Sequence, residues 1–149
     1  MTLYTATVSS FGYLHGAPPA DATLVIDLRD ALYDPHVDPA MRQLTAQDPR
    51  VFEHVANNRR AQAVVHAAVE LANALATGAR PTGTAPAGDD EIHVHIAYGC
   101  AGGRHRAAAA AIMTSAAMAA AGWRTELVHR DIDRAVVERD RRGRAAAAI

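Results

Sequence analysis

The sequence predicts a single α/β domain, in which about four strands form a mixed or parallel sheet with helices packed on it. Short apolar runs alternate along the chain with longer segments of helical periodicity, and this alternation is typical of the class. Residues 23–28 form a nearly continuous apolar run, TLVIDL, as expected for a strand covered on both faces. The length of 149 residues, half of them apolar, suits one hydrophobic core for the whole chain.

Turn and cap residues divide the chain into eight predicted elements. Strands are predicted at residues 3–9, 23–28, 91–98 and 124–129, and helices at 48–57, 59–77, 104–121 and 131–143. Asp48 and Pro49 are typical of an N-cap and a first helical position, and Gly78 and Gly122 of helix ends. The buried face of the second helix is predicted as Ala61, Val65, Ala68, Leu71 or Ala72, and Leu75. Residues 78–90 are rich in Gly and Pro, and a flexible loop is expected there.

The single cysteine, Cys100, excludes a disulfide within the chain, which favours a reducing compartment. The N-terminus has neither the basic start nor the long apolar stretch of a signal peptide. The alanine-rich run at 107–121 contains Thr114 and Ser115 and is only weakly apolar, so we expect a buried helix and not a membrane span. These features predict a cytoplasmic protein that has no contact with membranes.

The charge of the chain is small overall but unevenly distributed. All 15 basic residues are arginine, so every cationic contact involves a planar guanidinium that is always charged. Residues 1–98 carry a net charge of −5 and residues 99–149 a net charge of +4, which together give the net −1. The basic second part suits either an anionic partner or a solvated surface of mixed charge.

Residues 99–106, GCAGGRHR, form a glycine-rich turn between a predicted strand and a predicted helix. Ligands of open α/β sheets lie at the carboxyl ends of strands, and a helix N-terminus offers unpaired N–H groups and a positive dipole end. The glycines Gly99, Gly102 and Gly103 allow these N–H groups to point inward, and His105 and Arg106 add further donors. The loop is therefore predicted to hold a phosphate-like anion; the alternative is a tight turn that needs glycine for packing only.

The spacing from Cys100 to Arg106 is C-x5-R, which resembles the phosphatase loop of the cysteine phosphatases. In that chemistry a thiolate attacks phosphorus, and a helix N-terminus and arginines lower the pKa of the thiol. Those phosphatases carry Ser or Thr after the arginine, whereas this chain has Ala107. No aspartate is evidently placed as a general acid, although Asp27, Asp34 and Asp131 are candidates. Hydrolysis by Cys100 and Arg106 is kept as the alternative to simple binding.

Four ordered motifs resemble the C-terminal domain of the RNase adapter RapZ and its YvcJ-type relatives. The loop GCAGGRHR is similar to the family's GC-T-GG-x-HR-S motif. Residues 9–29, 34–48 and 128–131 resemble its SFG…G-x-P-x-DAD-x-V-x-D-x-R, NP-x-WDP-x-LR-x-LTG-x-D and HRD segments. The resemblance covers roughly residues 1–57 and 91–132, and it implies a domain that binds small RNA and glucosamine-6-phosphate and helps its protein to oligomerise.

The resemblance also implies which residues surround the ligand. Those of the phosphate loop are Gly99, Cys100, Gly102, Gly103, His105 and Arg106, with Ala101 and Arg104 between them. Those of the surrounding cleft are Asp27, Arg29, Arg42, Thr45, His129 and Arg130. His15, in the glycine-containing loop after the first strand, is a further candidate from its position. RNA contacts are expected from the basic closing segment, at Arg134, Arg139, Arg141, Arg142 and Arg144.

The chain departs from the family pattern in three respects. Full-length members begin with a P-loop domain, but no G-x-x-x-x-G-K-[ST] motif occurs here and, without lysine, none is possible. Kinase or NTPase activity is therefore not expected. Ala101 and Ala107 replace a threonine and a serine of the loop, so two hydroxyl donors to a phosphate are lost. Arg104 replaces the usual lysine and keeps its charge.

Other side chains admit a functional and a structural interpretation. His93 and His95 share one face of a strand and are predicted to be hydrogen-bonded, because no carboxylate completes a metal site. Asp27 and Arg29 are either an ion pair or part of the ligand site. Asp34 and Asp38, near His36, are expected in a solvated turn, and Trp123 is expected in the core.

The leading hypothesis is a non-catalytic regulatory module that holds a phosphorylated small molecule of the amino-sugar class, or an RNA phosphate, at residues 99–106. No cofactor and no metal ion are expected. A separate P-loop protein and small RNA are the macromolecular partners considered, and the resemblance implies a homo-oligomer.

Overall fold

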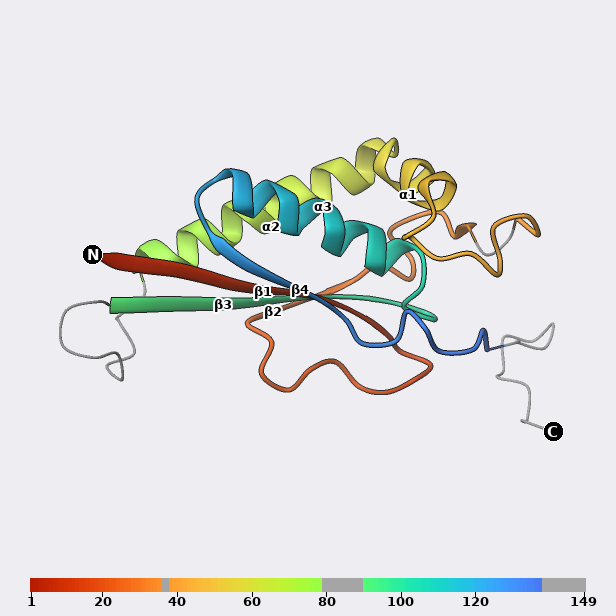
Figure 1. Ribbon diagram of the computed structural model, residues 1–149, viewed down its shortest axis with the longest axis horizontal. Helices are drawn as coiled ribbons and strands as arrows, with labels where there is room; N and C mark the ends of the chain where they lie inside the picture. Colours follow the sequence, from red (N-terminus) through yellow and green to blue (C-terminus); the bar gives the residue numbers. More distant parts are fainter. Residues whose placement is uncertain (36–37, 79–89, 138–149) are drawn as a thin grey trace.

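The computed structural model describes residues 1–35, 38–78 and 90–137, which form four strands and three helices (Figure 1). The strands are β1 (Thr2–Gly12), β2 (Leu24–Asp27), β3 (Asp90–Cys100) and β4 (Arg124–His129). The helices are α1 (Pro49–Ala56), α2 (Arg59–Gly78) and α3 (Arg106–Ala120). The α/β class and the single sheet are as predicted from the sequence.

All strand pairs in the sheet are parallel, in the order β2-β3-β1-β4. The long strands β3 and β1 are central, with Val8 opposite Ile96 on one side and Leu127 on the other. The first two strands are joined by residues 13–23, which contain no helix and cross β3 to reach the far edge of the sheet.

The three helices cover one face of the sheet, and the connection 13–23 passes across the other (Figure 1). The helical face carries apolar residues such as Ala6 and Val8, whereas the opposite face carries polar residues such as Thr5 and Thr7. The expectation that β2 is covered on both faces is therefore wrong. Val25 is 44% exposed, because no helix covers its side of the sheet.

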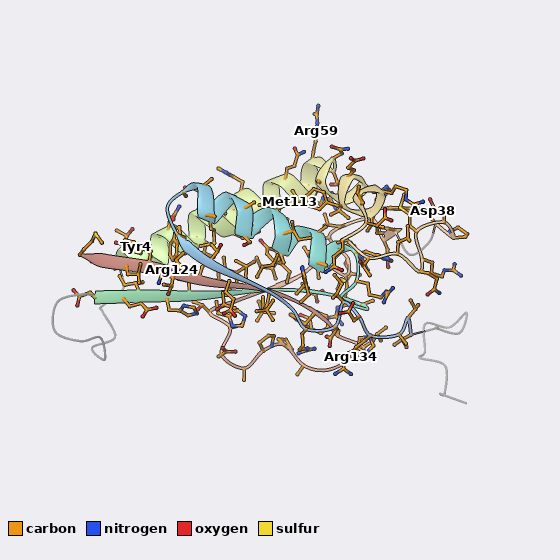
Figure 2. The ribbon with its side chains drawn as sticks, viewed as in Figure 1. Tyr4, Asp38, Arg59, Met113, Arg124 and Arg134 are labelled. Carbon is orange, nitrogen blue, oxygen red and sulfur yellow. The ribbon has the colours of Figure 1, made fainter. Side chains whose placement is uncertain are left out.

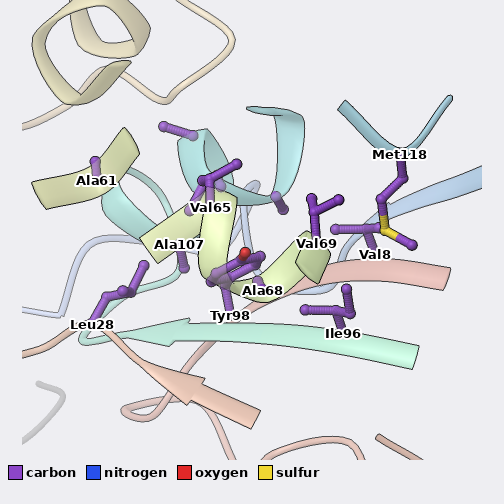
Figure 3. Close-up of a cluster of buried hydrophobic side chains, with 14 of the residues drawn as sticks. Val8, Leu28, Ala61, Val65, Ala68, Val69, Ile96, Tyr98, Ala107 and Met118 are labelled. Carbon is purple, nitrogen blue, oxygen red and sulfur yellow. The ribbon is translucent and has the colours of Figure 1, made fainter. Parts of the chain in front are cut away.

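The core lies between the sheet and the helices (Figure 3). Val8 and Ile96 of the sheet are fully buried under α2 and α3. Tyr98 is also fully buried, and its hydroxyl lies 2.6 Å from the Thr114 hydroxyl of α3. Burial raises the pKa of Tyr98 to about 12, so the phenol stays neutral. Five consecutive alanines at 107–111 have almost no exposed surface, which allows the first turns of α3 to approach the sheet closely.

The buried face of α2 differs by one position from the prediction. Ala61, Val65, Ala68, Val69, Ala72 and Ala76 are buried. Of the two alternatives Leu71 and Ala72, Ala72 is the buried one and Leu71 is 47% exposed; Leu75, which was predicted in the core, is 41% exposed. Buried residues at 61, 65, 68, 72 and 76 follow helical spacing toward the sheet, and both leucines lie beside that line.

The predicted helix at 131–143 is absent over residues 131–137, and its remainder lies outside the described residues. Arg104 explains the difference, because its guanidinium donates to the carbonyl groups of Ile132 and Arg134. Asp131 is fully buried and accepts from the Gly12 N–H. The Arg104 contacts thus use two backbone carbonyl groups that would accept hydrogen bonds within a helix, and the Asp131 side chain fixes the start of the segment to β1. The predicted flexible loop at 78–90 lies largely outside the described residues.

Candidate functional site

The glycine-rich loop and the end of β1 cross at the carboxyl edge of the sheet. Tyr13 N and Leu14 N donate to the carbonyl oxygens of Cys100 and Ala101, at 2.9 and 3.0 Å. Gly103 has a φ of 75°, and a Cβ atom there would lie 2.7 Å from Gly12 N. A Cβ on Gly12 would lie 2.5 Å from the backbone of Gly102. Gly12 and Gly103 are therefore required because two backbones touch.

The other two glycines of the loop have different surroundings. A Cβ on Gly99 would lie 2.5 Å from both the Phe11 and Tyr13 rings, which stack edge to face at 4.9 Å. A Cβ on Gly102 would meet only the Arg104 side chain, at 4.0 Å. Gly99 and Gly103 thus agree with the alternative that the loop needs glycine for close packing. Of the three glycines in this loop, only Gly102 has room for a side chain.

Arg106 is 4% exposed and binds the segment that follows β2. Its Nη1 donates to the carbonyl groups of Leu28, Arg29 and Leu32 at 3.3, 2.7 and 3.2 Å. Its Nη2 lies 2.8 Å from Asp34 Oδ2. Asp34 therefore pairs with a buried arginine, and the expectation that it lies in a solvated turn is wrong. The two terminal nitrogens of Arg106 hold residues 28–34 against the start of α3.

Arg104 and His105 bind two further segments in the same way. Arg104 donates to the Gln43 carbonyl at 2.8 Å, in addition to its bonds with the 132–134 segment. His105 Nε2 lies 2.8 Å from the Leu44 carbonyl oxygen. Three consecutive side chains therefore fix residues 28–34, 43–44 and 132–134 around the N-terminus of α3.

The N-terminus of α3 itself has no capping side chain. His105 occupies the N-cap position, but its side chain makes no cap hydrogen bond. The first helical residues, Arg106, Ala107 and Ala108, are buried, and the first N–H groups of a helix have no partner within it. The buried Nε atoms of Arg104 and Arg106 have no hydrogen-bond partner among the described residues. The N-terminus of α3 therefore combines several N–H donors with the positive end of the helix dipole.

Cys100 is 3% exposed, and its Sγ atom accepts from Gly103 N at 3.3 Å. In a phosphatase loop the arginine would bind the phosphate held over the thiolate. Here both terminal nitrogens of Arg106 are bonded to residues 28–34 instead. The arrangement gives hydrolysis by Cys100 and Arg106 no support.

Arg29 provides an exposed cation at the same edge of the sheet. It pairs with Asp27 at 2.6 Å, and its guanidinium lies 3.8 Å above the Tyr13 ring. The hydrogen bond from Arg29 lowers the pKa of Asp27, so the carboxylate stays ionised. Burial raises the pKa of Tyr13. Both members of the pair remain about two-fifths exposed, so Arg29 is accessible to an anion.

Asp131 joins the ends of β1 and β4. It accepts from Gly12 N at 2.8 Å and pairs with Arg130 and Arg134 at 2.9 and 3.0 Å. Burial by itself would raise the pKa of Asp131, but hydrogen bonds from Arg130 and Gly12 outweigh it and lower the pKa. Arg130 also donates to the carbonyl groups of residues 16 and 17.

Asp131→Asn is expected to lower the free energy of unfolding at pH 7 by about 1.5–3 kcal/mol, the range for hydrogen bonds to a charged group. The folded-state pKa is depressed, so this stabilisation is present above the unfolded pKa of about 3.9 and disappears as the pH falls through the folded value. Urea unfolding at pH 7 and pH 3 tests this. A difference between wild type and variant that stays constant with pH would contradict it.

The other predicted site residues mainly make hydrogen bonds to neighbouring residues of the chain. His129 Nδ1 lies 2.6 Å from the Ser10 hydroxyl, and burial lowers the pKa of His129. Thr45 accepts from Gln47 N, and the backbone of Arg42 donates to Asp38 in the turn before α1. His15 has a buried Nε2 atom without a hydrogen-bond partner in the described part of the chain.

The basic closing segment is described only in part. The Arg134 side chain is 58% exposed and lies toward the carboxyl end of the sheet, well away from Tyr4 and Arg124 (Figure 2). The other RNA-contact candidates, Arg139, Arg141, Arg142 and Arg144, lie outside the described residues.

A second polar cluster lies on the sheet face that the helices leave uncovered. His93 bonds with the Thr5 and Thr7 hydroxyls, and His95 Nε2 lies 2.8 Å from the Ser9 hydroxyl. Both histidines are hydrogen-bonded, as predicted. In residues 1–35, 38–78 and 90–137, no three His, Cys, Asp or Glu side chains are grouped to hold a metal ion.

Two site contributors were missed or misjudged from sequence alone. Asp34 was assigned to a turn, and only the fold shows that it faces Arg106 from 72 residues away. Tyr13 was missed from the sequence. It follows Phe11 and Gly12 at the end of β1, and its ring lies under the Arg29 guanidinium.

Trp123 is buried as predicted, against Tyr4, and donates to Asn73. No helix within the described ranges has the length and apolarity needed to cross a membrane.

Comparison with known proteins agrees with the motifs. Relatives named "Nucleotide-binding protein" are 40% identical over 129 residues in Streptomyces griseus and 38% identical over 125 residues in Thermus thermophilus. These alignments cover 87% and 84% of this chain but only 36% and 42% of the relatives. The chain therefore spans well under half the length of these proteins. The sequence model of the RapZ C-terminal domain matches residues 4–133, and the chain belongs to this family.

Proposed function

We propose that this domain is a RapZ-like regulatory module that holds a phosphate group at the N-terminus of α3 without converting it. The observation that carries the proposal is the buried start of α3, which has no side-chain cap hydrogen bond and beside which the buried Nε atoms of Arg104 and Arg106 have no hydrogen-bond partner in the part of the chain that the structure describes. Buried N–H donors without partners are costly, and an anion satisfies them while interacting favourably with the helix dipole.

The contacts divide the predicted residues into two roles. Arg104, His105 and Arg106 position the surrounding segments, because their terminal nitrogens are bonded to backbone carbonyls and to Asp34. Direct contact with the anion is proposed for the backbone at Gly102 and for the accessible guanidinium of Arg29. The ligand class is a phosphosugar, such as glucosamine-6-phosphate.

The nucleotide-binding name of the relatives is not extended to this domain. The chain spans less than half of those proteins, and it contains neither a lysine nor a P-loop.

Calorimetric titration with glucosamine-6-phosphate and with inorganic phosphate, in low-salt buffer free of phosphate, tests the site. Gly102 permits a matched pair of variants, because a side chain at this position meets no backbone atom. Gly102→Ala is expected to keep the affinity within about threefold, and Gly102→Asp to lower it about tenfold or more, because a carboxylate then faces the anion.

Equal affinity in Gly102→Ala and Gly102→Asp would show that the anion is held elsewhere. Absence of heat with either ligand would reject the phosphosugar, and a short RNA would then be titrated over a range of salt concentrations. A phosphate-backbone ligand gives an affinity that falls steeply with salt. An affinity for RNA that is independent of salt would reject the adapter role as well.

A further inference from the structure

A short strap, residues 18–22, belongs to the connection that passes across the sheet face opposite the helices (Figure 1). Before the strap, the Arg130 guanidinium donates to the carbonyl oxygens of residues 16–17. After it, Thr23 N donates to the His95 carbonyl oxygen at 2.8 Å, and His95 N donates to the Thr23 hydroxyl at 2.9 Å. An arginine is always charged and backbone groups do not titrate, so both ends of the strap are held at any pH near neutrality.

Between these ends, the strap meets the sheet at the side chain of His95. Asp21 Oδ2 lies 3.3 Å from His95 Nδ1, and His95 Nε2 lies 2.8 Å from the Ser9 hydroxyl. Ala22 N donates to the Pro19 carbonyl, which forms a turn around Asp21. The His95 side chain is 7% exposed and the Asp21 side chain is 83% exposed. The imidazole is therefore held inside the molecule, whereas the carboxylate is able to approach it or leave it.

The buried Nδ1 atom of His95 has no hydrogen-bond partner among the described residues, although a carboxylate lies beside it. In the neutral ring with its proton on Nε2, Nδ1 directs a lone pair toward Asp21, and the contact is repulsive. In the other neutral tautomer Nδ1–H faces Asp21, but the ring carries no charge. A second proton makes both nitrogens donors and allows a charge-assisted hydrogen bond to Asp21, which is the stronger kind. Each ring nitrogen of His95 thus has an acceptor beside it for a proton.

Few other charged groups surround His95. Among the described residues, Asp21 is the one carboxylate within 4.0 Å of the ring. β1 places the Ser9 hydroxyl beside the ring and has no charged side chain. The remaining titratable or charged side chains of the strands on this sheet face are His93 and Glu91 of β3, Arg124 and Glu126 of β4 beyond β1, and Asp27 at the far end of β2. The charge of the ring is therefore felt first by Asp21.

We propose that the strap is sensitive to pH: protonated His95 binds Asp21 and fixes residues 18–22 to the sheet, and neutral His95 releases them. Imidazole is the side chain that changes its charge between about pH 5 and 8, and aspartate is ordinarily ionised throughout this range. Release of the strap uncovers the buried His95 and Ser9 side chains, so the accessible part of this sheet face increases as the pH rises.

This device goes beyond the proposed anion site and does not depend on it. The contacts of Tyr13 and Leu14 with the glycine-rich loop precede the Arg130 anchor, whereas the strap follows it. Binding or release of the strap is therefore expected to leave the 99–106 loop unchanged. The backbone amide signals of that loop serve as an internal reference in the experiment below.

Nuclear magnetic resonance between pH 5 and pH 8 follows the His95 ring and the strap amides in one sample. In the wild type, the signals of residues 20–22 are expected to shift with the same midpoint as the His95 ring. Hydrogen exchange of these amides, corrected for its intrinsic pH dependence, is expected to be about two- to fivefold slower at pH 5 than at pH 8, the range for an exposed ion pair.

Asp21→Asn is the decisive variant, because it keeps the shape of an exposed side chain and removes its charge. Its strap signals are expected to stop following the His95 ring, and the ring is expected to take up its proton at a lower pH than in the wild type. Asp21→Glu is expected to retain the response. His93→Gln is the matched control, because His93 lies on the same face and binds Thr5 and Thr7, and it should leave the strap response unchanged.

Three results would overturn the proposal. One is a His95 ring that takes up no proton between pH 5 and pH 8. Another is a strap whose signals stay constant while the ring titrates. The third is a response of the strap that is equal in the wild type and in Asp21→Asn, because the carboxylate would then have no part in it.

Discussion

Arg106→Met is expected to lower the free energy of unfolding by about 3–5 kcal/mol, the range for removing one partner of a buried charged pair. Methionine keeps the aliphatic stem but donates no hydrogen bond. The carbonyl groups of Leu28, Arg29 and Leu32 and the Asp34 carboxylate would then lose their shared partner. Urea unfolding, followed by the fluorescence of the single tryptophan, measures the loss.

Arg29→Met is the control for this variant. Its ion pair with Asp27 is exposed, so a loss of only about 0–1 kcal/mol is expected. If both variants cost the same, Arg106 would have no special role in holding residues 28–34. The comparison also separates stability from ligand binding, because Arg29 is the residue proposed to meet the anion.

Gly103→Ala is expected to have a similarly large effect on stability. The positive φ of Gly103 costs an alanine about 1–2 kcal/mol, and forcing a side chain into a packed site costs about 1–3 kcal/mol more. The added Cβ would lie 2.7 Å from Gly12 N and 2.8 Å from the Phe11 carbonyl carbon, so backbone would have to move. Thermal and urea unfolding measure the change.

Gly102→Ala is the neighbouring control. Its Cβ meets nothing closer than 4.0 Å, and a change within about 1 kcal/mol is expected. A stable Gly103→Ala protein would show that the crossing of β1 and the loop can relax. A strongly destabilised Gly102→Ala protein would show that the open space beside this residue is needed for the fold.

Local sequence signals predicted most of the fold because they act over short distances. The strand β4 was predicted with its observed limits, since Gly122 and Trp123 precede it and its six residues have strand character. The first strand was predicted three residues short at its carboxyl end. Ser10 looks like a loop residue, but its hydroxyl is satisfied by His129, 119 residues away. Such a partner cannot be inferred from neighbouring positions.

The position of the candidate site was also predictable, but the roles of its side chains were not. The glycine-rich turn between a strand and a helix predicted a site at the carboxyl edge of the sheet, and residues 99–106 lie at that edge. The pattern did not reveal that Arg106 turns toward residues 28–34, because those residues are brought there by β2. The failed helix prediction at 131–137 has the same cause, since Arg104 binds the carbonyl groups of Ile132 and Arg134 only in the folded chain.

The parallel pairing of β1 with β3 has a consequence for how the domain folds. Thr2 pairs with Asp90, and the same separation of 88 residues persists along the whole ladder to Gly12 and Cys100. Chains dominated by such distant pairings close large loops before they gain contacts, and they fold slowly. The crossing of Gly12 with the 101–105 loop is the last part of this ladder. The proposed anion site is therefore expected to require the complete fold, and a ligand bound there is expected to stabilise the complete domain over partly folded chains.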